Sequence, residues 1–135
     1  MIFGLGSDIV QIPRIEEMLS SSGERFIQRV FTPQEQEGAS KLGSENMRGR
    51  SAYFAKRFAA KEAFAKAIGH GFRDGLAMKD IGVVNDAKGK PILVLSERAK
   101  LLLDDYGCGT KLKAHISLSD DYPVAFAVVV LAHLL

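Results

Sequence analysis

Residues 54–69 constrain the fold of this chain more than any other segment. They read Phe-Ala-Lys-Arg-Phe-Ala-Ala-Lys-Glu-Ala-Phe-Ala-Lys-Ala-Ile-Gly, an alanine-rich pattern that predicts one helix stopping at Gly69. Apolar side chains fall on every side of this helix, which is typical of a buried helix. Charged residues stand among those apolar positions, namely Arg57, Lys61, Glu62 and Lys66. Because an unpaired buried charge is costly, we expect these charges to line a cleft and to find partners that include a ligand.

The charge balance of this region indicates the kind of ligand. Six basic residues and one acid, Glu62, occur between positions 48 and 66. The basic residues are Arg48, Arg50, Lys56, Arg57, Lys61 and Lys66. Lysine and arginine both bind phosphate oxygens, so a cleft with this balance suits a polyanion. A lone carboxylate within it suits a metal ion.

A second acid, Asp8, stands in a stretch that predicts a strand over residues 2–10. It shares a face with Gly4 and Gly6, which indicates close packing against the backbone there. Asp8 and Glu62 together offer the hard oxygen ligands that Mg²⁺ prefers. The spacing leaves an alternative open, in which Asp8 caps the next helix and Glu62 pairs with Lys66 one turn away.

The order of predicted elements defines an α+β fold. Strands are expected at 2–10, 81–84, 91–95, 111–119 and 124–131. The first helix is expected to begin at Pro13, and the second to run from the capping box at Thr32 to about Gly43. Two more helices are expected, over 50–68 and between Ser96 and Gly107. Residues 44–49 are expected to form a loop. We expect a mainly antiparallel sheet packed around the long central helix.

Size and composition predict a single domain over residues 1–135. The net charge of +2 is too small to indicate a nucleic-acid binder. Cys108 is the only cysteine, which fits a reducing compartment. The apolar segment 124–135 is too short to span a membrane, and no signal peptide opens the chain. The cytoplasm is therefore the expected location.

Two further groups of side chains are candidates for binding. Arg14 and Arg25 flank the first predicted helices, where they are either ordinary surface charges or contacts for an acidic partner. His115 lies on the polar face of a predicted strand, where it is either a hydrogen-bonded bystander or part of a site.

Four blocks of sequence together resemble the bacterial holo-[acyl-carrier-protein] synthases, a group of 4′-phosphopantetheinyl transferases. These blocks are Gly-Leu-Gly-Ser-Asp-Ile-Val at 4–10 with Arg14-Ile15, Arg-Phe-Ala-Ala-Lys-Glu-Ala-Phe-Ala-Lys-Ala-Ile-Gly at 57–69, Lys-Gly-Lys-Pro at 88–91, and His-Ile-Ser-Leu-Ser at 115–119. The resemblance covers nearly the whole chain in the right order. It implies a trimeric enzyme that uses Mg²⁺ and coenzyme A to modify an acyl carrier protein for fatty acid biosynthesis.

The resemblance also implies roles for individual residues. Asp8 and Glu62 would be the metal ligands and, with Lys66, the catalytic residues. Coenzyme A would be bound by Arg57, Phe58, Lys61, Lys66, Gly69, Pro91 and His115, with His115 reaching the nucleotide from a neighbouring subunit. Arg14 and Arg25 would dock the acidic carrier protein. Asp120 departs from the family pattern, because many relatives have histidine directly after the Ser-Leu-Ser block.

These residues suggest a reaction and leave two alternatives. A carrier-protein serine would attack the phosphorus nearer the pantetheine arm, with the metal and Lys66 neutralising charge on the leaving nucleotide. Either Glu62 or a water at the metal would take the serine proton. One alternative is a non-catalytic module that binds RNA phosphates, although no strand pattern of base-stacking aromatics is visible. The other is the same enzyme acting on carrier domains of polyketide or peptide synthases.

Overall fold

The computed structural model describes residues 1–73 and 75–134. Leu135, the last residue of the predicted apolar segment, lies outside the described residues. The elements run β1 (Ile2–Gln11), α1 (Ile12–Val30), α2 (Pro33–Ser40), α3 (Met47–Ile68), the 3₁₀ turn η1 (Met78–Asp80), β2 (Ile81–Asn85), β3 (Pro91–Leu95), α4 (Glu97–Gly107), β4 (Leu112–Asp121) and β5 (Val124–His133). This is the predicted α+β order.

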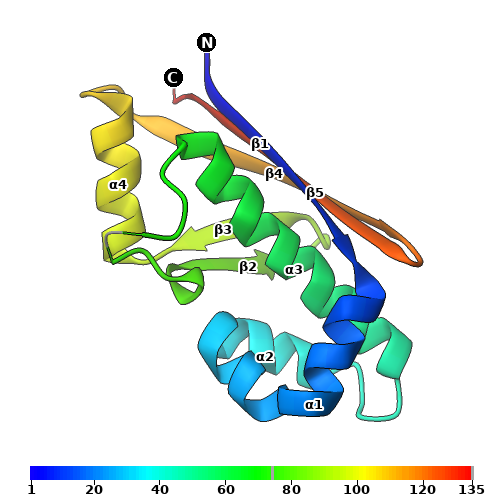
Figure 1. Ribbon diagram of the computed structural model, residues 1–135. Coiled ribbons are helices and arrows are strands. Elements are labelled where there is room, and N and C mark those ends of the chain that lie inside the picture. The colour runs from blue at the N-terminus through cyan, green and yellow to red at the C-terminus, as the bar shows by residue number, and fades with distance from the viewer. Residues whose placement is uncertain (74, 135) are drawn as a thin grey trace.

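Two antiparallel sheets form the β part of the fold. One has the strand order β1-β5-β4 and the other is the hairpin β2-β3. Figure 1 shows α3 lying along one face of the three-stranded sheet. Helices α1 and α2 lie near the N-terminal half of α3, and α4 lies near the C-terminal end of α3. The chain termini lie side by side at one end of this sheet, where the His133 amide donates to the Met1 carbonyl. None of the helices within the described ranges is long and apolar enough to cross a membrane.

Local sequence explains most element boundaries. The capping box at Thr32 is confirmed, since its side chain accepts from the Glu35 amide while the Glu35 carboxylate accepts from the Thr32 amide. Gly69 ends α3 in the left-handed conformation, as predicted. Several strand ends differ from the prediction by one or two residues, and two helix boundaries differ by more. Helix α2 ends at Ser40 rather than near Gly43, and α3 begins at Met47 because the Asn46 side chain caps it by accepting from the Gly49 amide.

The contact between β1 and α3 fixes the centre of the fold. Gly4 and Gly6 face the helix, and a side chain at either position would overlap its backbone. A Cβ on Gly6 would lie 1.9 Å from the Ala63 carbonyl oxygen, and one on Gly4 would lie 2.4 Å from that of Ala67. Strand and helix therefore meet backbone to backbone, as the two glycines on the Asp8 face predicted.

Replacing Gly6 with valine should destabilise the protein by at least about 2–3 kcal/mol, because overpacking against a backbone cannot be relieved by rotating a side chain. Urea denaturation followed by circular dichroism measures this loss. Gly23→Ala is the matched control, since a Cβ at that position meets no atom within 4 Å. Equal stability of Gly6→Val and the parent protein would contradict the described packing of β1 on α3.

Candidate active site

Asp8 and Glu62 line the same groove, although they come from two different elements, β1 and α3. Asp8 follows Gly6 on the face of β1 that meets α3, and Glu62 lies in the part of α3 that packs there. The groove has a volume of about 500 Å³. Its lining comprises Asp8, Ile9, Val10, Arg14, Ile15, Glu17, Met18, Ser21, Phe26, Phe58 and Glu62. We call it the acid groove.

The surroundings of Glu62 are electrostatically unusual. Partial burial raises the pKa of its carboxyl group, and the nearby Asp8 raises it further, while Lys66 acts in the opposite direction. A carboxyl group that is desolvated beside a second acid is typical of a functional site. A nearby positive charge would therefore stabilise the two carboxylates.

Lys66 supplies part of this positive charge. Its Nζ donates to Asp8 Oδ1 and to the Ser7 carbonyl, both at 3.0 Å. Asp8 does not cap the helix that follows, because the N-cap of α1 is Gln11 and it makes no side-chain cap bond. The structure thus differs from the alternative in which Asp8 serves as a helix cap.

A second depression adjoins the acid groove at Glu62. It has a volume of about 340 Å³ and is lined by Glu62, Ala65, Lys66, Gly69 and Gly71. Gly69 and Gly71 both have positive φ, so the backbone turns tightly here without side chains to fill the space. We call it the glycine depression. Its open backbone and its lysine are suited to an anionic group.

The wall of the acid groove is largely apolar. Phe26 and Phe58 lie with their ring centroids 6.4 Å apart, and Met18 is 42% exposed. Arg14 lies at the rim and is exposed. Arg25 is also exposed on α1, but it is not among the residues that line the groove.

Lys61 requires a correction. Its side chain is fully buried, and its Nζ donates to Glu35 Oε1 at 2.7 Å and to the Ile81 carbonyl. Its charge is therefore balanced inside the protein, and the expectation that Lys61 faces a ligand is wrong. Sequence reasoning assigned Glu35 only a helix-capping role. The need of a buried lysine for a buried acid was the one available signal, and it did not identify which acid.

Arg57 also lies away from the acid groove. It is 4% exposed, and its guanidinium stacks on the Tyr53 ring at 3.6 Å. Its Nε has no hydrogen-bond partner among the described residues. Arg57 lines a separate hollow with Lys41 and Asn85, on the side of α3 that carries α2 and β2.

Pro91 and His115 come together in a hollow of their own. It measures about 290 Å³ and also contains Lys90 and Lys113, two cations that the sequence reasoning did not single out. Neither Asp8 nor Glu62 lines this hollow. Within one chain, the structure therefore does not join His115 to the acids.

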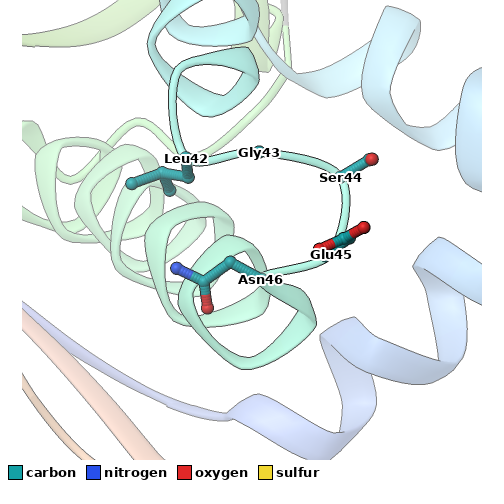
Figure 2. Close-up of a pocket in the computed structure, with 5 residues that line it drawn as sticks. All are labelled: Leu42, Gly43, Ser44, Glu45 and Asn46. Carbon is teal, nitrogen blue, oxygen red and sulfur yellow. The ribbon is translucent and has the colours of Figure 1, made fainter.

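Another hollow, of about 510 Å³, lies in the loop between α2 and α3. Figure 2 shows the five residues that line it following one another around the loop, from Leu42 to Asn46. Glu45 is the only ionisable residue there. Without a cation or a second acid, this hollow lacks the chemistry of the acid groove.

The donor set of the acid groove fits a magnesium ion. In the part of the chain that the structure describes, no cluster of three or more His, Cys, Asp or Glu side chains could hold a metal. Asp8 and Glu62 supply two carboxylates, and Mg²⁺ commonly binds one or two carboxylates and takes its other ligands from water and substrate phosphates. Such an ion would need a phosphate-bearing ligand.

Comparisons with known proteins identify the family. The family model of the 4′-phosphopantetheinyl transferase superfamily matches residues 4–127. The holo-[acyl-carrier-protein] synthase of Paramagnetospirillum magneticum is 50% identical over 131 residues, which cover 96% of this chain and 95% of that protein. The chain belongs to the holo-[acyl-carrier-protein] synthase family of this superfamily.

Solved structures agree with this assignment. The holo-[acyl-carrier-protein] synthase from Neisseria meningitidis has a TM-score of 0.84 at 36% identity, covering 98% of this chain and 99% of that one. The holo-(acyl-carrier-protein) synthase from Bacillus anthracis, solved in complex with CoA (3′,5′-ADP), has a TM-score of 0.75 at 37% identity and covers 97% and 96% of the two chains. The predicted fold class is therefore confirmed.

Proposed function

We propose that this protein transfers the 4′-phosphopantetheine group of coenzyme A to a serine of apo acyl carrier protein. The products are holo acyl carrier protein and adenosine 3′,5′-bisphosphate. The observation that carries this proposal is the meeting of Asp8, Glu62 and Lys66 where an apolar groove adjoins the glycine depression. Coenzyme A has the matching construction, since a long neutral arm is joined to a pyrophosphate and a nucleotide.

Asp8 and Glu62 would hold Mg²⁺ between them. When bound, the ion would supply electrostatic stabilisation to the pyrophosphate of coenzyme A. Lys66 lies beside both acids and would bind a phosphate oxygen as a point charge, which neutralises the leaving nucleotide as the phosphorus–oxygen bond breaks. The serine oxygen forms the new bond to phosphorus, and its proton passes to Glu62 or to solvent.

The two hollows at Glu62 would bind different parts of coenzyme A. Phe58 and the other apolar residues of the acid groove suit the pantetheine arm, while Lys66 and Gly69 in the glycine depression suit the phosphates. Lys61 is left out of this assignment because it is internal. Arg57 would take part only through its own hollow on the α2 side of α3.

A homotrimer would complete the nucleotide site. Pro91 and His115 line a hollow separate from the acids, so they would act on coenzyme A held by a neighbouring subunit. The face of the three-stranded sheet opposite α3 also favours assembly, because Leu5 and Ile9 are each 64% exposed there and Phe126 is paired with Ile9. No described helix covers that face (Figure 1).

The acyl carrier protein would dock beside the acid groove. Arg14 at the groove rim and Arg25 further along α1 offer positive charge to an acidic partner. Fatty acid biosynthesis would be the pathway served. The whole chain would act as one domain in the cytoplasm, where the single cysteine stays reduced.

Mass spectrometry tests this function directly. The protein is incubated with apo acyl carrier protein, coenzyme A and Mg²⁺, and the carrier protein should gain the mass of one phosphopantetheine group. No gain under these conditions would overturn the proposal. A second incubation with an apo peptidyl carrier domain tests whether other carrier domains are accepted, and omission of Mg²⁺ tests the metal requirement.

On acidification, metal binding should begin to weaken at a pH above the usual glutamate pKa of 4.5. Burial and Asp8 raise the pKa of Glu62, so this carboxyl group takes up its proton at a higher pH than an ordinary one and then loses the ion. Mn²⁺ titrations followed by electron paramagnetic resonance across this range measure the effect. An affinity that stays constant down to the usual pKa would contradict it.

A further inference from the structure

We propose that Lys66 is a built-in competitor for the divalent cation and that binding of the cation frees it to receive an anion. This inference rests on the proposed function, because it takes Asp8 as a metal ligand. Lys66 would thus do more than attract phosphate. It would make the phosphate site depend on prior occupation of the metal site.

The contacts of Lys66 define a specific resting place. Its ammonium donates to Asp8 Oδ1 and to the Ser7 carbonyl, so two adjacent acceptors of β1 hold a side chain of α3. Lys66 lies one helical turn after Glu62 and therefore on the same face of α3. The ammonium is placed where it partly neutralises both acids.

A divalent ion held by the two acids would compete with Lys66 for the Asp8 carboxylate. The ammonium and the ion would also repel each other at close range. The Lys66 side chain is 54% exposed, whereas that of Asp8 is 17% exposed, so the lysine is the partner that can move into solvent. An ion pair whose lysine is this exposed is weak, so a divalent ion displaces the lysine readily.

The released ammonium of Lys66 would face the glycine depression. Lys66 also lines the glycine depression with Gly69 and Gly71, beyond Glu62 and away from the apolar wall of the acid groove. Displacement from Asp8 leaves its charge available to an anion in that depression. By linkage, an anion that holds Lys66 there favours the ion on the acids by the same factor.

The test measures metal affinity without any nucleotide. Mn²⁺ is titrated by electron paramagnetic resonance into the parent protein and into Lys66→Met and Lys66→Gln. Loss of the competing ammonium should tighten Mn²⁺ binding roughly three- to tenfold in both variants. A merely structural role for Lys66 gives the opposite sign, because disruption of the site weakens metal binding.

A control variant distinguishes competition by Lys66 for the metal site from a general effect of positive charge on metal affinity. Lys56→Met removes a cation from the same helix, but Lys56 pairs with Asp120 at 2.8 Å and does not line the acid groove. Its Mn²⁺ affinity should stay within about twofold of the parent value, since charges at a distance are screened by salt. Tightening by Lys56→Met equal to that by Lys66→Met would overturn the competitor role.

Asp8→Asn distinguishes this inference from the proposed function. If Asp8→Asn weakens Mn²⁺ binding while both Lys66 variants leave it unchanged or weaker, the competitor role is wrong and the metal site stands. If Asp8→Asn leaves Mn²⁺ binding unchanged, the metal site and the competitor role fail together. Weakening by Asp8→Asn with tightening by both Lys66 variants supports both.

Discussion

Replacement of Glu62 with alanine should reduce phosphopantetheine transfer roughly a thousandfold or more while leaving the protein folded. Asp8 and Glu62 are the two carboxylates proposed to hold the metal ion, and an ion held by Asp8 alone would be bound poorly. Partial burial and the proximity of Asp8 both disfavour the charged form of Glu62 in the folded protein. Its removal should therefore cost little stability. Transfer is measured as the mass gain of the carrier protein over time.

Two further variants make this prediction specific. Glu62→Gln preserves the shape of the side chain and removes its charge, so it should lose activity as Glu62→Ala does. Glu97→Gln changes an acid in α4 whose side chain is 89% exposed, and it should retain full activity. Normal turnover by Glu62→Ala would reject the role of this residue. A large fall in melting temperature would show that Glu62 stabilises the fold instead.

Replacement of Glu35 with alanine should destabilise the protein by about 3–5 kcal/mol, because it leaves the ammonium of Lys61 buried without a counter-ion. Both side chains are fully buried. Glu35 also accepts hydrogen bonds from the backbone amides of Thr32 and Val83, so its loss affects α2, α3 and β2 together. Small domains are stable by only about 5–15 kcal/mol, so this loss would approach unfolding. Urea denaturation at neutral pH measures it.

The double variant Glu35→Ala/Lys61→Met tests the cause of this loss. Removal of both charges should recover part of the stability lost in Glu35→Ala, and the difference gives the coupling energy of the pair. Glu37→Ala changes an exposed acid of the same helix and should have little effect. Additive losses from the two single variants would show that the pair is not coupled.

Local patterns predicted most of the fold because they report local physics. The capping box at Thr32 and the glycine stop at Gly69 are decided within a few residues, and both are confirmed. The residues Ser21, Ser22 and Gly23 favour a break in the first helix, and α1 is kinked there at Ser22, whose backbone is non-helical. Tertiary packing of residues on both sides, including Ile15 and Phe26 in the core, continues the helix past a weak sequence.

The site was only partly predictable for the same reason. Asp8 and Glu62 could be recognised by residue type, and the glycines beside Asp8 indicated a close neighbour without naming it. Lys61 could not be separated from Lys66 by sequence, since both interrupt the same apolar helix. Their environments differ because Lys61 faces Glu35 across the core, whereas Lys66 faces β1. Only the three-dimensional position of α2 decides this.

The backbone contact between β1 and α3 has a consequence for how the protein would respond to its ligands. Asp8 and Glu62 are distant in sequence, and the chain between them includes α1 and α2. A cation shared by the two acids would close that long stretch into a loop, and a closed loop loses less entropy on folding. The first strand would then fray less readily from the helix, and slower amide hydrogen exchange in β1 would report that tightening.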